Sequence, residues 1–520
     1  MTKHKVFLIV RDGWGFSENK EGNAIAAAKT PFDDHLNKNY KPVLLKAHGP
    51  AVGLPEGFQG SSEVGHMNMG AGQIVIQEVT RINNMLETGE FYQSRKFREL
   101  LSLVKNNQTG IHLMGLLQDE GVHAHQQHLF LLMQYFFKNF PENKIYIHVF
   151  ADGRDTPPKS TRIFIKQLEE QLTDQPNGML ATVTGRYYSM DRSNNYDLIT
   201  TGYDAICSAK GDRFHDIHQT IEECYQNQKT PDNQPMFDEY LKPLIHTDYT
   251  GVNEGDILIN FNYRQDRAIQ MTKAFTEPGT PIKSPFVKNL HYYGFTQYYN
   301  EFDHYFVDPL SSGDSAPVLV GKVIADAGLK QLRISETQKF RHVTSFFNGK
   351  STKPFPLEDQ VEIPSQFDPS SFATHPEMNA NEITEEVLKR LEQDYAFVLT
   401  NYANCDMVGH TGEFDSAVKG AEIVDRNVEI VAKRAMELGY EVLITADHGN
   451  SEEMLDIQTS EVKTSHTLNP VNLHLFSKKY GLVLQSGEGI LSDISTLVLR
   501  LMDLPVPDVM NARHIELIEK

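Results

Sequence analysis

The run Val6-Phe-Leu-Ile-Val10 is followed at once by Arg11-Asp-Gly-Trp-Gly15. Five consecutive apolar residues predict a strand that is buried on both faces. Asp12 comes directly after this strand, in a turn marked by two glycines. Loops at the carboxyl ends of parallel strands converge, so an acidic residue at this place is a candidate ligand. A turn-forming aspartate is the ordinary alternative, and residues 6–15 alone leave both open.

Similar short apolar runs recur along the chain and alternate with longer amphipathic segments. This alternation predicts an α/β protein. Apolar residues at helical spacing predict helices over 383–393 and 416–438. The other predicted strands cover residues 111–117, 144–150, 257–261, 396–400, 441–445 and 471–476. Pro, Gly and Ser concentrate at 308–317 and predict a linker there. A second boundary near 77–81 is needed if the early and late motifs share one site.

Composition narrows the class of protein. The chain has 520 residues, enough for two or more domains, and a net charge of −20. This acidic surplus argues against nucleic-acid binding but permits a small anionic substrate held by a local basic cluster. No run of about 18 apolar residues occurs, so a membrane span is not expected. The three cysteines show no CxxC pairing and the N-terminus shows no signal-peptide pattern, which together predict a reduced, cytoplasmic setting.

Two further motifs combine hydroxyl, carboxylate and imidazole groups. In Gly60-Ser-Ser-Glu-Val-Gly-His66, a hydroxyl at a helix N-terminus would lie beside backbone N–H groups suited to phosphate. The residues alone do not separate Ser61 from Ser62 as the nucleophile, and a simple helix N-cap is the alternative. Asp406 and His410 are four residues apart, so a helical turn would present both on one face, although surface Asp–His pairs are frequent.

A fourth motif follows a strongly apolar strand. Asp447 and His448 precede a glycine there, and His466 can complete the set, with a buried structural histidine as the alternative for it. Together the motifs supply three aspartates, three histidines and a serine. Such mixed oxygen and nitrogen donors suit Mn²⁺, Zn²⁺ or a similar ion. Two ions can activate a hydroxyl and neutralise the entering and leaving oxygens of a phosphoryl transfer.

Arginine-rich turns after predicted strands indicate an anion-binding site. They lie at residues 152–157, 184–192 and 262–267, and a turn with two histidines lies at 121–125. Guanidinium groups bind phosphate and carboxylate bidentately, so we expect a substrate that has both groups. Surface Arg–Asp pairs are the alternative for any single turn. Lys339 can add a point charge beside a transferring phosphoryl group.

In their order, these motifs resemble those of the 2,3-bisphosphoglycerate-independent phosphoglycerate mutases of the alkaline phosphatase superfamily. The resemblance rests on DGWG, SSEVGHMNMGAG, DGRDTPP, GRYYSMDR, ISETQKF, NCDMVGHTG and ADHGN, and runs from Asp12 to His466. It implies an α/β fold of two domains. A split alkaline-phosphatase-like, metal-binding domain would comprise residues 1–78 and 312–520. An inserted α/β phosphotransferase and substrate-binding domain would comprise 79–311. Closure with hinges near 77–81 and 308–317 would exclude water.

The resemblance also implies the reaction and its residues. Ser62 would form a phosphoserine during interconversion of 3-phosphoglycerate and 2-phosphoglycerate. Two divalent ions, with Mn²⁺ expected first and Zn²⁺, Co²⁺ or Mg²⁺ as alternatives, would be required, and 2,3-bisphosphoglycerate would not. One ion would take Asp406, His410 and His466, and the other Asp12, Ser62, Asp447 and His448. The implied substrate contacts are His123, Arg154, Asp155, Arg186, Arg192, Arg264, Arg267 and Lys339. Lys339 would stabilise the transition state, Asp155 would handle the hydroxyl protons, and the protein would be a monomer.

The chain departs from the family pattern at three places. Ser61 replaces a usual asparagine, Glu120 replaces a glycine, and Lys350 interrupts a glycine pair. None of these changes removes a predicted ligand, so we expect altered hydrogen bonding and loop shape rather than lost activity.

The sequence disfavours three other functions. A phosphopentomutase or phosphatase of the same superfamily is disfavoured by the arginine-rich insertion, which suits a carboxylate-bearing substrate. A non-catalytic metal-binding protein is disfavoured because every expected catalytic position is filled. A cofactor-dependent mutase would need an Arg-His-Gly motif, which the sequence lacks.

Overall fold

The computed structural model describes the chain except for residues 1–3, 105–108, 309–317, 457–460 and 486. The chain forms two compact units, Met1–Gln77 with Ser315–Lys520, and Glu78–Asp314. The predicted fold class, an α/β protein in which one domain is split by the insertion of another, is confirmed. The predicted second boundary, between 311 and 312, and nearly all of the predicted hinge at 308–317 lie outside the described residues.

The first unit is built around an eight-stranded sheet with the order β12-β11-β13-β1-β14-β15-β2-β17. Its strands are β1 (Lys5–Arg11), β2 (Val43–Lys46), β11 (Gln331–Glu336), β12 (Glu358–Ile363), β13 (Phe397–Tyr402), β14 (Tyr440–Thr445), β15 (Val471–Phe476) and β17 (Gly489–Ile490). Strands β11, β13, β1 and β14 run parallel, and β15 pairs antiparallel with β14. The side chains of Val6–Val10 are fully buried, as expected for a central strand covered on both faces.

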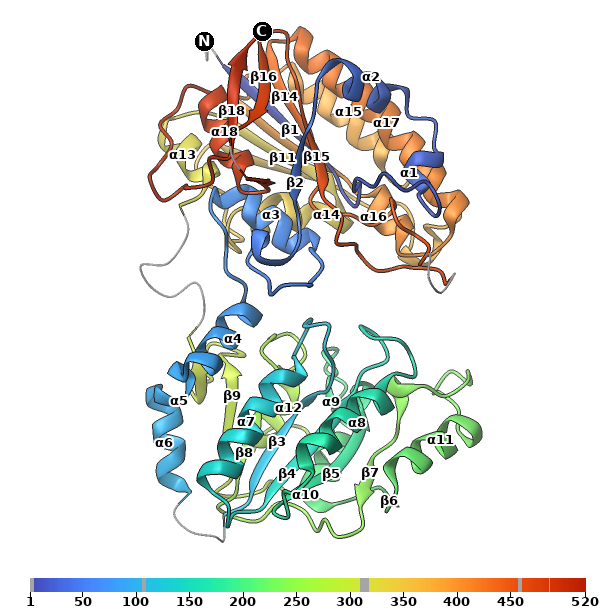
Figure 1. The fold of residues 1–520 in the computed structure, drawn as a ribbon, viewed down its shortest axis with the longest axis vertical. Helices are drawn as coiled ribbons and strands as arrows, with labels where there is room; N and C mark the ends of the chain where they lie inside the picture. Colours follow the sequence, from blue (N-terminus) through green and yellow to red (C-terminus); the bar gives the residue numbers. More distant parts are fainter. Residues whose placement is uncertain (1–3, 105–108, 309–317, 457–460, 486) are drawn as a thin grey trace. The chain divides into compact units, whose positions relative to one another are not determined.

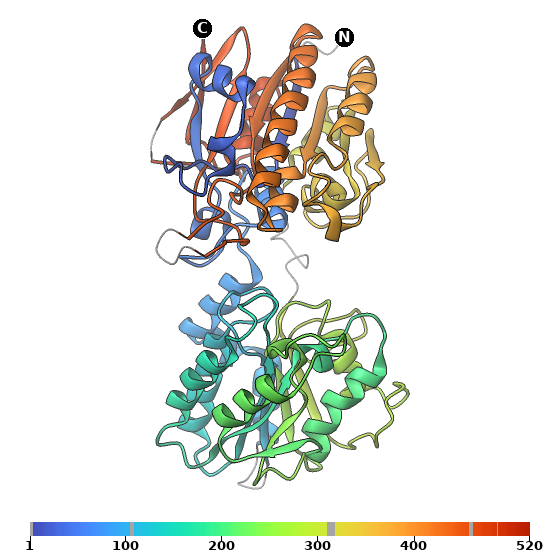
Figure 2. The same ribbon diagram turned by 90° about the vertical axis from the view of Figure 1, so that its right-hand side faces the viewer.

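Helices cover both faces of this sheet (Figure 1, Figure 2). On one face lie α15 (Ala380–Leu391) and α17 (Phe414–Glu437), which correspond to the two predicted helices. On the other lie α3 (Ser62–Ala71), α13 (Val320–Asp326) and α18 (Asp493–Leu501). Shorter helices are α1 (Ala24–Ala27), α2 (Pro31–Asn39), α14 (Thr337–Arg341) and α16 (Asn404–Gly409), and β16 (Tyr480–Leu484) and β18 (Ile515–Glu519) form a separate two-stranded sheet.

The second unit contains its own eight-stranded sheet, with the order β10-β9-β8-β3-β4-β5-β7-β6. Its strands are β3 (Ile111–Leu116), β4 (Ile145–Ala151), β5 (Gly178–Gly185), β6 (Asp212–Phe214), β7 (Leu244–His246), β8 (Ile257–Asn260), β9 (His291–Thr296) and β10 (Tyr305–Val307). Its helices are α4 (Glu78–Thr88), α5 (Glu90–Gln93), α6 (Arg95–Leu103), α7 (Gln126–Asn139), α8 (Thr161–Leu172), α9 (Arg186–Ser189), α10 (Tyr196–Ser208), α11 (Ile217–Asn227) and α12 (Ile269–Thr276).

Helices of the second unit cover both faces of its sheet. Helices α7 and α8 pack on one face of the sheet, and α10 and α12 pack on the other. All the strands predicted from apolar runs are present in the two sheets, with bounds within two residues of the predicted ones. Among the helices of the described residues, none has the length and apolar character needed to cross a membrane.

Candidate active site

Four adjacent strands of the first unit end beside the predicted metal ligands. Asp12 follows β1, Asp447 follows β14, Asp406 lies on α16 after β13, and Lys339 lies on α14 after β11. The loops approach very closely at Gly13, which has a φ of 74° and where a Cβ would lie 2.6 Å from the backbone nitrogen of Asp406. Only glycine fits this backbone conformation and spacing without strain.

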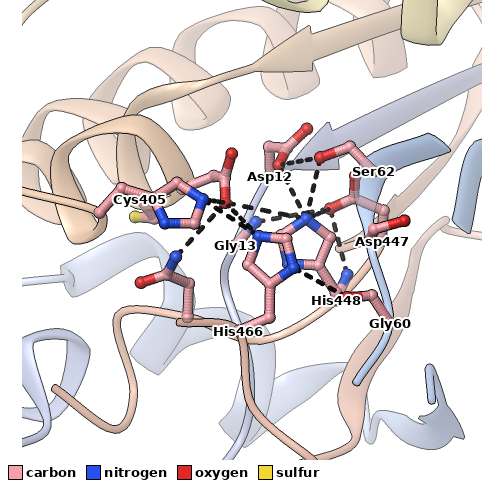
Figure 3. Close-up of polar contacts among 12 residues, drawn as sticks. Asp12, Gly13, Gly60, Ser62, Cys405, Asp447, His448 and His466 are labelled. Atoms are coloured by element: carbon pink, nitrogen blue, oxygen red, sulfur yellow. Dashed lines mark hydrogen bonds and ion pairs between the residues drawn. The ribbon is translucent and has the colours of Figure 1, made fainter. Parts of the chain in front are cut away.

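Ser62 is the first residue of α3, and its hydroxyl faces this group (Figure 3). Its Oγ lies 2.9 Å from His448 Nε2, 3.1 Å from Asp12 Oδ1 and 2.6 Å from Lys339 Nζ. Ser61 instead caps the helix, because its Oγ accepts a hydrogen bond from the Val64 amide at 3.4 Å. The two hydroxyls that the motif left open are therefore differently placed, and Ser62 is the one among the carboxylates and imidazoles.

The predicted ligands form two sets with spacings suited to divalent ions. In one set, Asp406 Oδ1, His410 Nε2 and His466 Nε2 are each 3.1 Å from the other two. In the other, Asp12 Oδ1 and His448 Nε2 are 3.3 Å apart, and both contact Ser62 Oγ. Ligands around a tetrahedral ion at about 2.1 Å are about 3.4 Å apart, so both sets match that chemistry. Buried Asp447 lies beside the second set, with its Oδ1 3.8 Å from His448 Nε2.

Lys339 supplies a buried positive charge between the two sets. Its Nζ is 2.8 Å from Asp12 Oδ1 and 2.6 Å from Asp406 Oδ2. Burial alone would lower the pKa of Lys339, but Asp12 and Asp406 raise it above its ordinary value. Although burial opposes it, Lys339 also holds the pKa of Asp406 well below its usual range. The ammonium is therefore retained, directed at the hydroxyl and at both carboxylates.

The histidines of the site differ in charge. Burial lowers the pKa of His448, but Asp447, Asp12 and Asp406 together raise it to about 10. Burial and the neighbouring His448 lower the pKa of His466. Because imidazole must be neutral to bind a metal, ion binding at His448 would release a proton.

Apart from Lys339, which lies in the first unit, the predicted substrate residues gather in the second unit, where strands β3, β4, β5 and β8 end. Most of their charges are paired with carboxylates. Arg186 Nη1 contacts Asp152 Oδ1 at 2.5 Å and Asp155 Oδ2 at 2.6 Å. Arg154 Nη2 contacts Glu239 Oε1 at 2.6 Å. Each of these two guanidinium groups is therefore paired with at least one carboxylate of the protein.

Asp266 binds three more members of the predicted set. It lies 2.6 Å from Arg192 Nη1, 3.2 Å from Arg264 Nε and 3.6 Å from His123 Nδ1. Burial, with nearby Arg186, lowers the pKa of His123 to about 3, so this imidazole is neutral.

Arg267 differs from its neighbours in having no ion pair among the described residues. Its Nη1 donates a hydrogen bond to the Met190 carbonyl at 3.1 Å. Burial and the nearby Arg186, Arg192 and Arg154 lower its pKa. The Arg267 guanidinium is thus not paired directly with a carboxylate of the described residues, as expected of a group that binds an anion.

The chain is similar in sequence to known metalloenzymes over nearly its whole length. The Metalloenzyme superfamily matches residues 4–506. The 2,3-bisphosphoglycerate-independent phosphoglycerate mutase of Vesicomyosocius okutanii is 38% identical, over 99% of this chain and 98% of its own. The enzyme of the same name from Clostridium perfringens (strain 13) is 40% identical, over 98% of both chains. This chain belongs to that family of mutases. The predicted family and enzyme class are confirmed.

The fold of the family is also seen in a solved structure. The phosphoglycerate mutase of Leishmania mexicana, determined at low cobalt concentration, superposes with a TM-score of 0.76 and 27% sequence identity. The superposition covers 99% of this chain and 98% of that one.

Several residues that sequence reasoning did not single out as ligands support the mutase site. His66 Nδ1 lies 2.9 Å from the Ser62 carbonyl and 3.2 Å from Asp447 Oδ2. Asn401 Nδ2 donates to Asp12 Oδ2 at 2.7 Å. His66 had a usable signal, since it lies one helical turn after Ser62. By distance alone, His66 groups with Asp12 and Asp447, and His448 groups with Asp406 and His466, each group having donor atoms within 4.8 Å.

Proposed function

We propose that this mutase interconverts 3-phosphoglycerate and 2-phosphoglycerate through a phosphoserine at Ser62, with two divalent ions and without 2,3-bisphosphoglycerate. The proposal rests on one observation above all. The buried Ser62 hydroxyl lies within 3.1 Å of a carboxylate, an imidazole and an ammonium group at once. A serine hydroxyl is a weak nucleophile unless its surroundings favour the alkoxide, and these neighbours can do so.

We assign the ions to the two ligand sets already described. One would be held by Asp406, His410 and His466, and the other by Asp12, Ser62, Asp447 and His448. Ions bound there would lower the pKa of the serine hydroxyl and offset charge on phosphoryl oxygens. Mn²⁺ is the first choice because mixed carboxylate and imidazole donors accept it, and Zn²⁺, Co²⁺ and Mg²⁺ are alternatives.

The chain's own groups have definite tasks in this proposal. Ser62 Oγ attacks phosphorus, the bond from phosphorus to the substrate's 3-oxygen breaks, and glycerate is left beside a phosphoserine. Lys339 Nζ, 2.6 Å from Ser62 Oγ, donates to the alkoxide and then to phosphoryl oxygens. Asp155 moves the hydroxyl protons of glycerate, and Arg267 with its neighbours binds the carboxylate. After glycerate reorients, its 2-hydroxyl attacks the phosphoserine, which regenerates Ser62.

Metal-stripped protein tests the proposal in an assay for 3- and 2-phosphoglycerate without 2,3-bisphosphoglycerate. We expect turnover only after Mn²⁺ is added back. Ser62→Ala should abolish turnover, while Ser61→Ala should leave it because Ser61 only caps α3. Appreciable turnover by Ser62→Ala would contradict the phosphoserine. Turnover by fully stripped wild-type protein would contradict the metal requirement.

The proposal also covers the setting of the reaction. We propose a cytoplasmic monomer that acts on small phosphoglycerates and has no nucleic-acid or membrane partner. The net charge of −20 supports the lack of a nucleic-acid partner, and the three free cysteines support the cytoplasmic setting.

A further inference from the structure

The Glu452 carboxylate is buried, and each of its two oxygens accepts two hydrogen bonds. Glu452 is 1% exposed. Its Oε2 accepts from the Gly15 amide at 3.1 Å and from the Asn450 amide at 2.8 Å. Its Oε1 accepts from the Thr467 hydroxyl and from Asn469 Nδ2, the latter at 3.0 Å. No lysine, arginine or histidine of the described part of the chain forms an ion pair with it, so these four donors are what stabilises the charge.

The donors come from three loops that also contain predicted metal ligands. Gly15 is three residues after Asp12, Asn450 is two residues after His448, and Thr467 directly follows His466. The same loops touch directly as well. The Asn450 amide lies 3.1 Å from the Gly13 carbonyl, and the Thr467 amide donates to the Gly449 carbonyl at 3.1 Å. Glu452 is thus a side chain to which all three loops donate hydrogen bonds.

The loops are built tightly around this carboxylate. A Cβ at Gly15 would lie 2.2 Å from Glu452 Cδ, and a Cβ at Gly449 would lie 2.3 Å from Glu452 Oε1. Glycine at both positions lets the backbones come within hydrogen-bonding distance of the carboxylate. Any change in its shape or hydrogen bonding must therefore move at least one of the loops.

We infer that Glu452 is a positioning residue that holds Asp12, His448 and His466 at the mutual distances needed to bind divalent ions. The inference rests on the proposed metal-dependent function. It follows from the sensitivity of ion binding to ligand spacing, which groups that contact the ligand-bearing segments set. Glu452 contacts no substrate in this scheme, and its effect passes through the loops.

Glu452→Gln is the main test, because it preserves shape but replaces one accepting oxygen with an amide NH₂. Either the two backbone donors or the Thr467 and Asn469 donors then lose their acceptor. Mn²⁺ binding is measured by titration of stripped protein without substrate, so the readout is affinity rather than activity. We expect the dissociation constant of Mn²⁺ to rise about 10-fold or more.

Two further variants separate positioning from other effects. Thr467→Val removes one donor but keeps the Glu452 charge, and we expect a smaller weakening in the same direction. Asp493→Asn is the matched control. Asp493 is also fully buried and accepts hydrogen bonds from the Ile490 and His514 amides, both at 2.8 Å, but contacts none of the three loops. We expect Asp493→Asn to lower the melting temperature and leave Mn²⁺ affinity within twofold of wild type.

The outcomes are distinct. Unchanged affinity in Glu452→Gln, or equal weakening in Asp493→Asn, would overturn the inference while leaving the metal site standing. Weakening in Glu452→Gln with none in Thr467→Val would assign the effect to charge and overturn positioning. If Glu452→Gln fails to fold, Thr467→Val alone decides between weakened affinity and none. Failure of the wild-type protein to bind Mn²⁺ would overturn the proposed metal site and this inference together.

Discussion

The proposed anion site depends on Arg267. Its arginine neighbours are paired with carboxylates, whereas Arg267 forms no ion pair among the described residues. We expect Arg267→Met to raise KM about 10- to 100-fold. A hydrogen bond to a charged group contributes about 1.5–3 kcal/mol, and the loss of that free energy corresponds to this change in KM. Steady-state kinetics with 3-phosphoglycerate measures this. Arg162→Met is the control, since Arg162 pairs with Glu222 in the same unit. A KM unchanged from wild type would contradict the anion-binding role.

Glu336 shows the cost of burying an acid. Burial raises its pKa to about 7, and its Oε1 has no hydrogen-bond partner among the described residues. As pH rises from about 4.5 to about 7, the unfolded state loses this proton first, so the folded state becomes relatively less stable. Glu336→Gln should remove this loss. We expect the free energy of unfolding of Glu336→Gln, relative to that of wild type, to increase by about 3 kcal/mol as the pH rises over that range. Urea unfolding at several pH values measures the difference, and a pH-independent difference would refute it.

Helix α3 shows how an element places a nucleophile. Gly65 lies within its first turn and a half, and a Cβ there would lie 2.7 Å from the Asp447 carbonyl oxygen. That neighbour is backbone and cannot rotate away. We expect Gly65→Ala to push the helix from the Asp447 loop and to lower kcat about 100-fold, as a displacement of about 1 Å can do. The matched control is Ala71→Gly at the other end of α3. Wild-type kcat in Gly65→Ala would show that the loop yields.

The chain comprises two units, each of which has its own main sheet. All the proposed metal ligands belong to the first unit, so ion binding should stabilise that unit alone. Ion at about 1,000 times its dissociation constant contributes about 4 kcal/mol. We expect calorimetry of stripped and Mn²⁺-loaded protein to show one transition shifted and the other unchanged. A shift of both transitions together would mean that the units unfold as one.

Much of the architecture could be predicted from local pattern. The run Val6–Val10 became the central strand β1, because a strand covered on both faces must be continuously apolar. The candidate ligands Asp12 and Asp447 were found by their place after such runs, since strand ends converge at one edge of a sheet. Family resemblance then distinguished Ser62 from Ser61, which the motif alone left open.

Other features depend on packing between segments far apart in the chain. Lys339 contacts Asp12 across 327 residues, and Glu452 joins the Gly15 loop across 437. Neither contact has a local signal, because hydrogen-bond partners at such separations are chosen by how loops fold over a finished sheet. The sequence likewise does not distinguish Arg267 from the other arginines of the cluster, because the ion pairs that separate them form only in the folded chain. The spacing of apolar residues and the polar residues that follow strands are local properties, so the sequence by itself determines them. Ion pairs, hydrogen bonds between loops and the burial of charged groups depend on distant segments that meet only in the tertiary structure.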